Sequence, residues 1–104
     1  MPEGATVIVE HAVLNVRPGE EEAFIDAVNQ GLPLLAATDG FLSATVSRGI
    51  ESPSTFILDV EWESVDAHTE GFRGSDRFAQ WKALTHHFYE PFPVVEHFAP
   101  VAEA

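Results

Sequence analysis

The sequence has no cysteine and few basic residues. The absence of cysteine excludes disulfides, thiolate metal sites and thiol nucleophiles. Only 5 Lys and Arg residues stand against 17 Asp and Glu residues, which gives a formal net charge of -12. This balance argues against nucleic acids and anionic membranes as partners, because both are bound mainly through Lys and Arg side chains that neutralise phosphates.

Long apolar runs and targeting signals are also lacking. No run approaches the roughly 20 apolar residues that a membrane-spanning helix requires. The start, Met1-Pro2-Glu3-Gly4, has no basic region followed by an apolar stretch, which a signal peptide would have. We therefore expect a cytoplasmic protein that does not contact membranes.

Motifs for cofactors and metals are absent as well. The segment Gly71-Phe72-Arg73-Gly74 is not a phosphate loop, because it lacks the preceding strand and the helix spacing of a dinucleotide site. His86 and His87 are adjacent, so on a helix they would point about 100° apart and could not bind one metal ion by spacing alone. We expect no organic cofactor and no metal.

The residues that are present favour a single α+β domain over residues 1–104. A chain of 104 residues with 45% apolar side chains can supply a core for one domain. Ser64 and Ser75 are expected to cap two helices, and Pro33 is expected to kink or restart an earlier one. The predicted strands cover residues 6–16, 41–50, 55–63 and 94–101, and the predicted helices begin near residues 20, 64 and 75.

This order of elements predicts a ferredoxin-like fold, with helices on one face of a four-stranded antiparallel sheet. Both faces of the first strand are mostly apolar, so both faces of the sheet are expected to be covered. On the face without helices, Val7, Val9, Val13 and Ile57 would form an apolar patch. A second copy packed against this face would bury the patch, which predicts a homodimer.

The second half of the chain carries an ordered set of landmarks, from a strand that ends at Trp62 through a short helix and an aromatic helix to a last strand. These landmarks are Ser64, Ala67, His68, Phe72, Ser75, Phe78, Trp81, Pro91 and His97-Phe98. Their spacing resembles the antibiotic biosynthesis monooxygenase family, and the resemblance covers nearly the whole chain. It implies a dimeric α/β barrel that oxidises an aromatic or quinol-like substrate with O₂, without metal or flavin, in a pocket between helices and sheet.

The resemblance leaves several activities open. Cofactor-independent oxygenases of this group place an Asn, a Trp and a Tyr around the substrate, and haem-degrading relatives use an Asn, a Trp and a His. The corresponding positions here fall near Ala12, Gly71 and Lys82, so no complete triad is present and haem degradation is the weaker alternative. Two further alternatives are a non-catalytic dimeric module that binds a small ligand, and an isomerase or cyclase that uses a single base.

Two residues are candidate catalytic groups. His68 lies on the predicted short helix, and an ordinary histidine titrates near the pH at which a base could remove a proton from a phenol. Glu10 would face the helices, where poor solvation raises the pKa of a carboxyl group, unless Arg48 or Arg73 pairs with it. The alternative for His68 is a surface or packing role, which single histidines adopt more often.

Aromatic side chains are expected to form the substrate pocket, because they supply most of the binding area in such sites. The short helix over residues 64–72 is brief and ends in glycine, so it is predicted to be a loosely held lid. A role in the core is the alternative for Trp62 and Trp81. The predicted pocket residues are Trp62, Phe72, Phe78, Trp81 and Tyr89.

Two more histidines, His11 and His97, are predicted on neighbouring strands. If both point to one face of the sheet, they could pair with Asp59 or Glu61. Such a group would be a metal or pH-sensitive site, or a hydrogen-bond network at the dimer interface.

Overall fold

The computed structural model describes residues 7–104, so the predicted strand start at Thr6 and the segment Met1 to Gly4 lie outside the described residues. Four strands are present: β1 (Ile8–Asn15), β2 (Phe41–Arg48), β3 (Thr55–Trp62) and β4 (Val95–Phe98). Two α-helices, α1 (Glu21–Ala36) and α2 (Asp76–Thr85), are accompanied by a π-helix, η1 (Ala67–Phe72), and a 3-10 helix, η2 (His86–Phe88).

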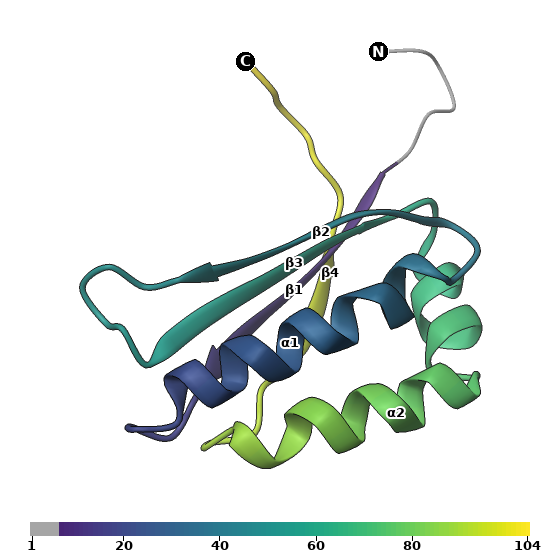
Figure 1. The fold of residues 1–104 in the computed structure, drawn as a ribbon. Helices are drawn as coiled ribbons and strands as arrows, with labels where there is room; N and C mark the ends of the chain where they lie inside the picture. Colours follow the sequence, from purple (N-terminus) through teal and green to yellow (C-terminus); the bar gives the residue numbers. More distant parts are fainter. Residues whose placement is uncertain (1–6) are drawn as a thin grey trace.

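The four strands form one antiparallel sheet in the order β2-β3-β1-β4. In Figure 1, α1 and α2 run side by side along one face of this sheet. The element order and the sheet together confirm the predicted ferredoxin-like α+β fold.

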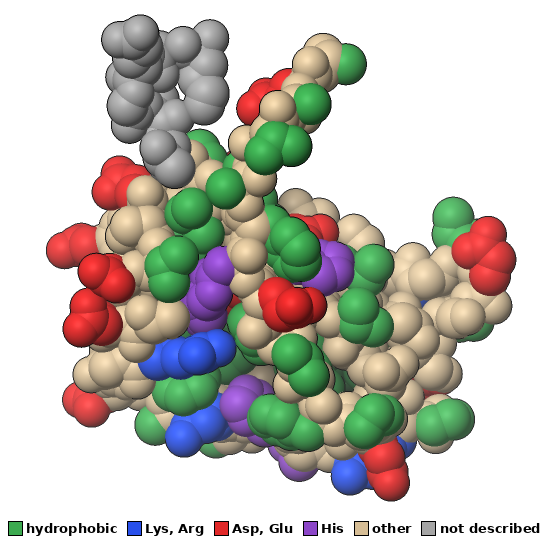
Figure 2. Space-filling model, turned by 180° about the vertical axis from the view of Figure 1, so that it is seen from behind, with side chains coloured by type: hydrophobic (Ala, Val, Ile, Leu, Met, Phe, Trp, Pro, Cys, Tyr) green, Lys and Arg blue, Asp and Glu red, His purple; other side chains and the backbone are tan. Residues whose placement is uncertain are grey.

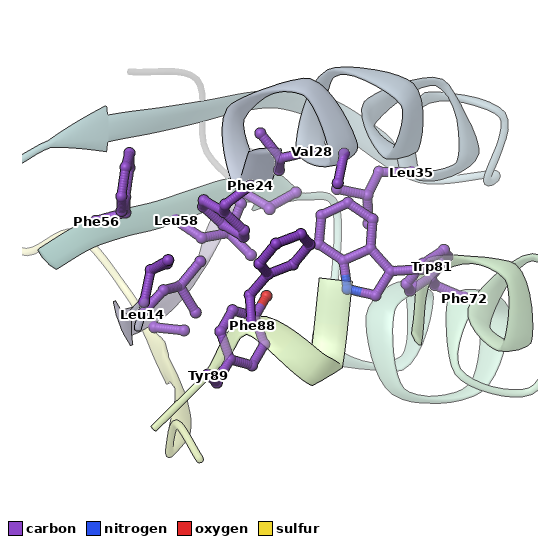
Figure 3. Packing of buried hydrophobic residues seen from close by; sticks show 14 of the residues in the cluster. Leu14, Phe24, Val28, Leu35, Phe56, Leu58, Phe72, Trp81, Phe88 and Tyr89 are labelled. Atoms are coloured by element: carbon purple, nitrogen blue, oxygen red, sulfur yellow. The ribbon is translucent and has the colours of Figure 1, made fainter. Parts of the chain in front are cut away.

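The core fills the space between the sheet and the two α-helices, where Phe24 and Val28 from α1 meet Phe56 and Leu58 from β3 (Figure 3). Alternation along the strands produces this arrangement, because every second side chain points to the same face. The predicted inward set of β3 is confirmed, since its four members are all buried: Phe56, Leu58, Val60 and Trp62. The same alternation on β1 buries Glu10, Ala12 and Leu14.

Helix α1 corrects part of one prediction, because it continues through Pro33 and does not restart there. The ring of Pro33 is exposed, so the carbonyl group that loses its backbone donor lies on the solvent side of the helix. Gly31 and Leu35 on the opposite side remain buried in one continuous stripe. No helix within residues 7–104 combines the length and apolar character needed to cross a bilayer.

The two predicted serine caps differ in outcome. The Oγ of Ser64 accepts a hydrogen bond from the backbone N–H of Ala67 at 3.1 Å, which is the expected capping contact. Ser75 occupies the position before α2, but its hydroxyl donates to the carbonyl of Phe72 and does not cap the helix. Ser75 therefore stabilises the turn between η1 and α2.

Candidate functional site

A cavity of about 200 Å³ lies between the helix-facing side of the sheet and the segments that run from η1 to β4. Its wall is mostly apolar, with a few polar groups converging on it. Arg73 and Phe92 are exposed members of this wall and mark its mouth. The lining residues include Glu10, Ala12, Leu14, Leu35, Leu58, His68, Phe72, Arg73, Phe78, Trp81, His86, Tyr89 and Phe92.

Among the aromatic residues predicted for the pocket, the structure places Phe72, Phe78, Trp81 and Tyr89 on the cavity wall. Phe72 and Trp81 lie next to each other at one end of the core (Figure 3), with ring centroids 6.3 Å apart.

Trp62 does not line the cavity, in contrast to its predicted role. Its ring is fully buried behind His68 and stacks on that imidazole with 5.5 Å between ring centroids. The Trp62 Nε1–H donates to Oε1 of Glu10 at 3.0 Å. Trp62 therefore positions Glu10 and His68. These two residues line the cavity and can contact a ligand, whereas Trp62 does not.

Glu10 is buried on β1 at the cavity wall, as the alternation of the first strand predicts. Burial raises its pKa above 4.5, while the hydrogen bond from Trp62 and the charge of Arg73 partly oppose that rise. Arg48, one of the two arginines considered as a partner, pairs with Glu22 instead. A carboxyl group of raised pKa in an apolar pocket is suited to accept a proton from a ligand.

His68 is buried on η1, with its side chain only 3% exposed. Its Nε2 lies 3.4 Å from Oε1 of Glu10, and its Nδ1 lies 2.8 Å from Nε2 of His97. Burial lowers the pKa of His68 to about 3, and the charges of Arg73 and His97 act in the same direction. The imidazole is thus neutral near pH 7, and its contact with Glu10 is not an ion pair.

His97 and His11 lie on opposite faces of the sheet, which corrects the idea that they share one site. Register explains this, because β4 pairs with β1 so that His97 is opposite Glu10 and His11 is opposite Glu96. On the face without helices, Nδ1 of His11 and Oδ1 of Asp59 are 2.7 Å apart. His97 faces the helices and extends the contact chain of Glu10 and His68 toward the edge strand.

Three further polar residues line the cavity: Arg73, His86 and Tyr89. Burial lowers the pKa of His86, with Lys82 and Arg73 adding to the effect. Burial raises the pKa of Tyr89 to about 12, so its hydroxyl keeps its proton and can donate a hydrogen bond to a ligand.

Helix η1 is anchored at two of its side chains, and its movement as a lid stays a prediction. His68 and Phe72 are both buried, and the backbone N–H of Arg73 donates to the carbonyl of His68 at 3.0 Å. This bond spans five residues and widens the turn into a π-helix, a feature often found at functional sites. The helix forms one wall of the cavity through His68 and Phe72.

Sequence reasoning missed Arg73 and His97 as parts of this site. It expected one of His86 and His87 to line the pocket beside Tyr89, and His86 is the one on the cavity wall. Alternation on the last strand could place His97 on a face, but only the register with β1 decides which residue it meets. Within residues 7–104, no group of three or more His, Asp or Glu side chains is arranged to hold a metal ion.

Comparison with known protein families identifies one match. Residues 7–84 match the family described as antibiotic biosynthesis monooxygenase. The uncharacterized protein YczJ of Bacillus subtilis (strain 168) is 43% identical over 95 residues, which cover 91% of this chain and all of YczJ.

Solved structures extend the likeness to the fold. A candidate antibiotic biosynthesis monooxygenase from Bordetella bronchiseptica is 35% identical, with a TM-score of 0.88 over 93% of this chain and 99% of that one. SnoaB, a cofactor-independent oxygenase from Streptomyces nogalater, is 16% identical, with a TM-score of 0.74 over 96% of each chain. The similarity to SnoaB concerns the fold alone.

Proposed function

The chain belongs to the antibiotic biosynthesis monooxygenase family, and from this premise we propose that it is a monooxygenase that oxidises a small aromatic or quinol-like compound with O₂. The observation that carries the proposal is an apolar cavity whose inner wall holds the buried pair of Glu10 and His68. SnoaB shows that this fold can serve a cofactor-independent oxygenase, and we propose the same independence here.

The size of the cavity narrows the substrate class. Sites for drug-sized ligands measure about 300–1,000 Å³, whereas this cavity measures about 200 Å³. We therefore propose a substrate with one or two aromatic rings. Phe72, Phe78 and Trp81 would supply most of its contact area, and Tyr89 would donate a hydrogen bond to one of its oxygen atoms.

In the proposed reaction, Glu10 removes the proton of a phenolic hydroxyl group. The resulting phenolate gives electrons to O₂, and one oxygen atom bonds to the ring carbon opposite the phenolate oxygen. That carbon loses its hydrogen and becomes a carbonyl, so the product is a quinone. The second oxygen atom leaves as water with the two hydrogens lost from the substrate. The substrate supplies all four electrons, so the balance requires no external reductant.

His68 and His97 would complete the proton path. The neutral imidazole of His68 lies between Glu10 at 3.4 Å and His97 at 2.8 Å. His97 is only partly buried and does not line the cavity. A proton taken up by Glu10 can thus exchange with solvent through the two imidazoles, because each imidazole can accept a proton at one nitrogen and release one from the other, and a proton returns to the second oxygen atom when water forms.

We also propose that the active protein is a homodimer. The face of the sheet opposite the helices exposes 41% of Val13 and 50% of Phe98, beside the partly buried Val9 and Ile57. Figure 2 views the molecule from behind and shows hydrophobic side chains gathered with histidines around the C-terminal segment. Two such faces packed together would remove this apolar surface from water.

The test of the proposed chemistry is oxygen uptake with a panel of phenols and quinols that have one or two rings. We expect Glu10→Gln to lower turnover by roughly a hundredfold or more, because the amide retains an acceptor for Trp62 but cannot take up the proton. Circular dichroism should show an unchanged fold. Glu63→Gln, at an exposed position just after β3, is the matched control and should keep its activity.

The outcomes separate the alternatives. Full activity of Glu10→Gln would contradict the role of Glu10 as the base. Binding of the panel compounds without oxygen uptake would favour a non-catalytic ligand-binding module, and conversion without oxygen uptake would favour an isomerase or cyclase that uses the same base.

A further inference from the structure

Basic side chains are scarce in this protein, and nearly all of them are engaged. The chain has 5 Lys and Arg residues against 17 Asp and Glu residues. Four of the five have partners: Glu90 for Arg17, Glu22 for Arg48, Thr38 for Arg77 and the ring of Phe78 for Lys82. The fifth is Arg73, and within residues 7–104 no carboxylate oxygen lies within 4 Å of its guanidinium group.

Arg73 stands at the mouth of the cavity. Its side chain is exposed and is also part of the cavity wall. Its positive charge reaches the polar groups inside, since it lowers the pKa values of Glu10, His68 and His86. The cavity therefore has a positive end in a molecule that is otherwise strongly acidic.

The backbone holds this arginine in place. The N–H of Arg73 donates to the carbonyl of His68 in the π-turn, and the N–H of Gly74 donates to the carbonyl of Glu70 at 3.1 Å. A Cβ atom added at Gly74 would lie 2.3 Å from that same carbonyl oxygen, so only glycine fits there without a backbone shift. The turn thus fixes where the Arg73 side chain starts, beside buried His68.

From this arrangement we propose that Arg73 is an anion subsite and that the ligand of the cavity is an aromatic carboxylate with one or two rings. The guanidinium group can bind a carboxylate through two parallel hydrogen bonds. The ring would lie on Phe72, Phe78 and Trp81, and the carboxylate would remain at the mouth. A net charge of -12 repels anions, so a local cation is needed to select them. This inference rests on the proposed function, because it assigns the substrate class of the same cavity.

Two probes that differ only in the carboxylate test the subsite: 5-hydroxy-1-naphthoate, whose hydroxyl and carboxylate lie on different rings, and 1-naphthol. Their binding to the full chain is measured by titration calorimetry under nitrogen, so that no oxygen chemistry contributes. We expect the naphthoate to bind roughly tenfold or more tightly than the naphthol, as a charge-assisted pair of hydrogen bonds would produce. Added salt should lower the affinity for the naphthoate and leave the affinity for the naphthol unchanged.

Substitutions assign the preference to a residue. Arg73→Gln should lower naphthoate affinity by roughly tenfold and leave naphthol affinity unchanged, whereas Arg73→Lys should retain part of the preference. Arg77→Gln is the matched control, because it removes the same charge from a side chain that bonds to Thr38 and does not line the cavity. It should bind both probes as the unmodified protein does.

Each contrary outcome has one meaning. Equal affinities of the two probes, or a naphthoate preference that survives in Arg73→Gln, would overturn the anion subsite and leave the proposed oxidation standing. If neither probe binds, the anion subsite falls, and oxygen uptake with the panel of phenols and quinols decides the proposed oxidation separately. Naphthoate binding without oxygen uptake in air would support the subsite and count against the oxidation alone.

Discussion

Glu10 and His68 are neighbours with opposite responses to burial. Burial raises the pKa of the carboxyl group and lowers that of the imidazole, because a poorly solvated site disfavours the charged form of each group. Glu10 remains the better proton acceptor of the two, while the pKa of about 3 makes His68 a weak base. The initial hypothesis gave His68 the pKa of an ordinary histidine. The structure indicates that Trp62 and the surrounding core remove that basicity by excluding water.

The depressed pKa of His68 predicts a particular dependence of stability on pH. Between about pH 6.5 and pH 3 the unfolded chain binds a proton at this residue that the folded protein does not bind. The contribution of neutral, buried His68 to the free energy of unfolding is fully present above pH 6.5 and is lost as the pH falls. His68→Gln should therefore flatten the acid side of the stability curve, by about 2 kcal/mol between pH 7 and pH 5.

Urea unfolding at a series of pH values measures this effect. Glu10 is retained in both proteins, and its raised pKa acts on stability in the opposite direction. His87→Gln removes an exposed histidine and is the matched control. If the free energy of unfolding changes with pH in the same way for His68→Gln and the unmodified protein, the depressed pKa of His68 is contradicted.

At the scale of elements, most of the fold could be predicted from the sequence. The inward stripe Phe56, Leu58, Val60 and Trp62 follows from strict alternation, which a single strand displays without any partner. The site was harder to predict, because it depends on relations between elements. The position of His97 depends on the pairing of β4 with β1, and that of Arg73 on a π-turn whose apolar pattern does not differ visibly from that of an α-helix.

The contact between α1 and α2 depends on a glycine. A Cβ atom at Gly31 would lie 2.7 Å from Cε3 of Trp81, a buried ring that also lines the cavity. Gly31→Ala should therefore destabilise the protein by about 1–3 kcal/mol through overpacking, although alanine by itself favours a helix. Displacement of the Trp81 ring should also weaken binding of the aromatic probes.

Gly71→Ala is the matched control for this prediction. A Cβ atom there would meet Cγ2 of Thr38 at 3.5 Å, an ordinary contact, so we expect little change in stability. Thermal unfolding of both variants measures the difference. An equal loss of stability in Gly31→Ala and Gly71→Ala would contradict the explanation that the added methyl group at residue 31 collides with Trp81.

At the scale of the whole molecule, charge and apolar surface are distributed unevenly. The protein is strongly acidic, yet one face of its sheet carries Val9, Val13, Ile57 and Phe98 around the pair of His11 and Asp59. Alternation along the strands predicted Val9, Val13 and Ile57 on this face, and the pairing of β4 with β1 adds Phe98. The proposed second copy would cover the patch and leave most acidic side chains in water.

Val13→Glu tests the proposed dimer, because Val13 is exposed near the middle of β1 on this face. In a two-fold dimer the change would bury one unpaired charge from each copy, so association should weaken by roughly a hundredfold or more. Light scattering at micromolar concentration should give twice the chain mass for the unmodified protein and the single-chain mass for Val13→Glu. Val65→Glu, at a site 39% exposed outside the sheet, should remain a dimer. A monomeric unmodified protein would overturn the proposal, and a dimer that tolerates Val13→Glu would move the interface to another surface.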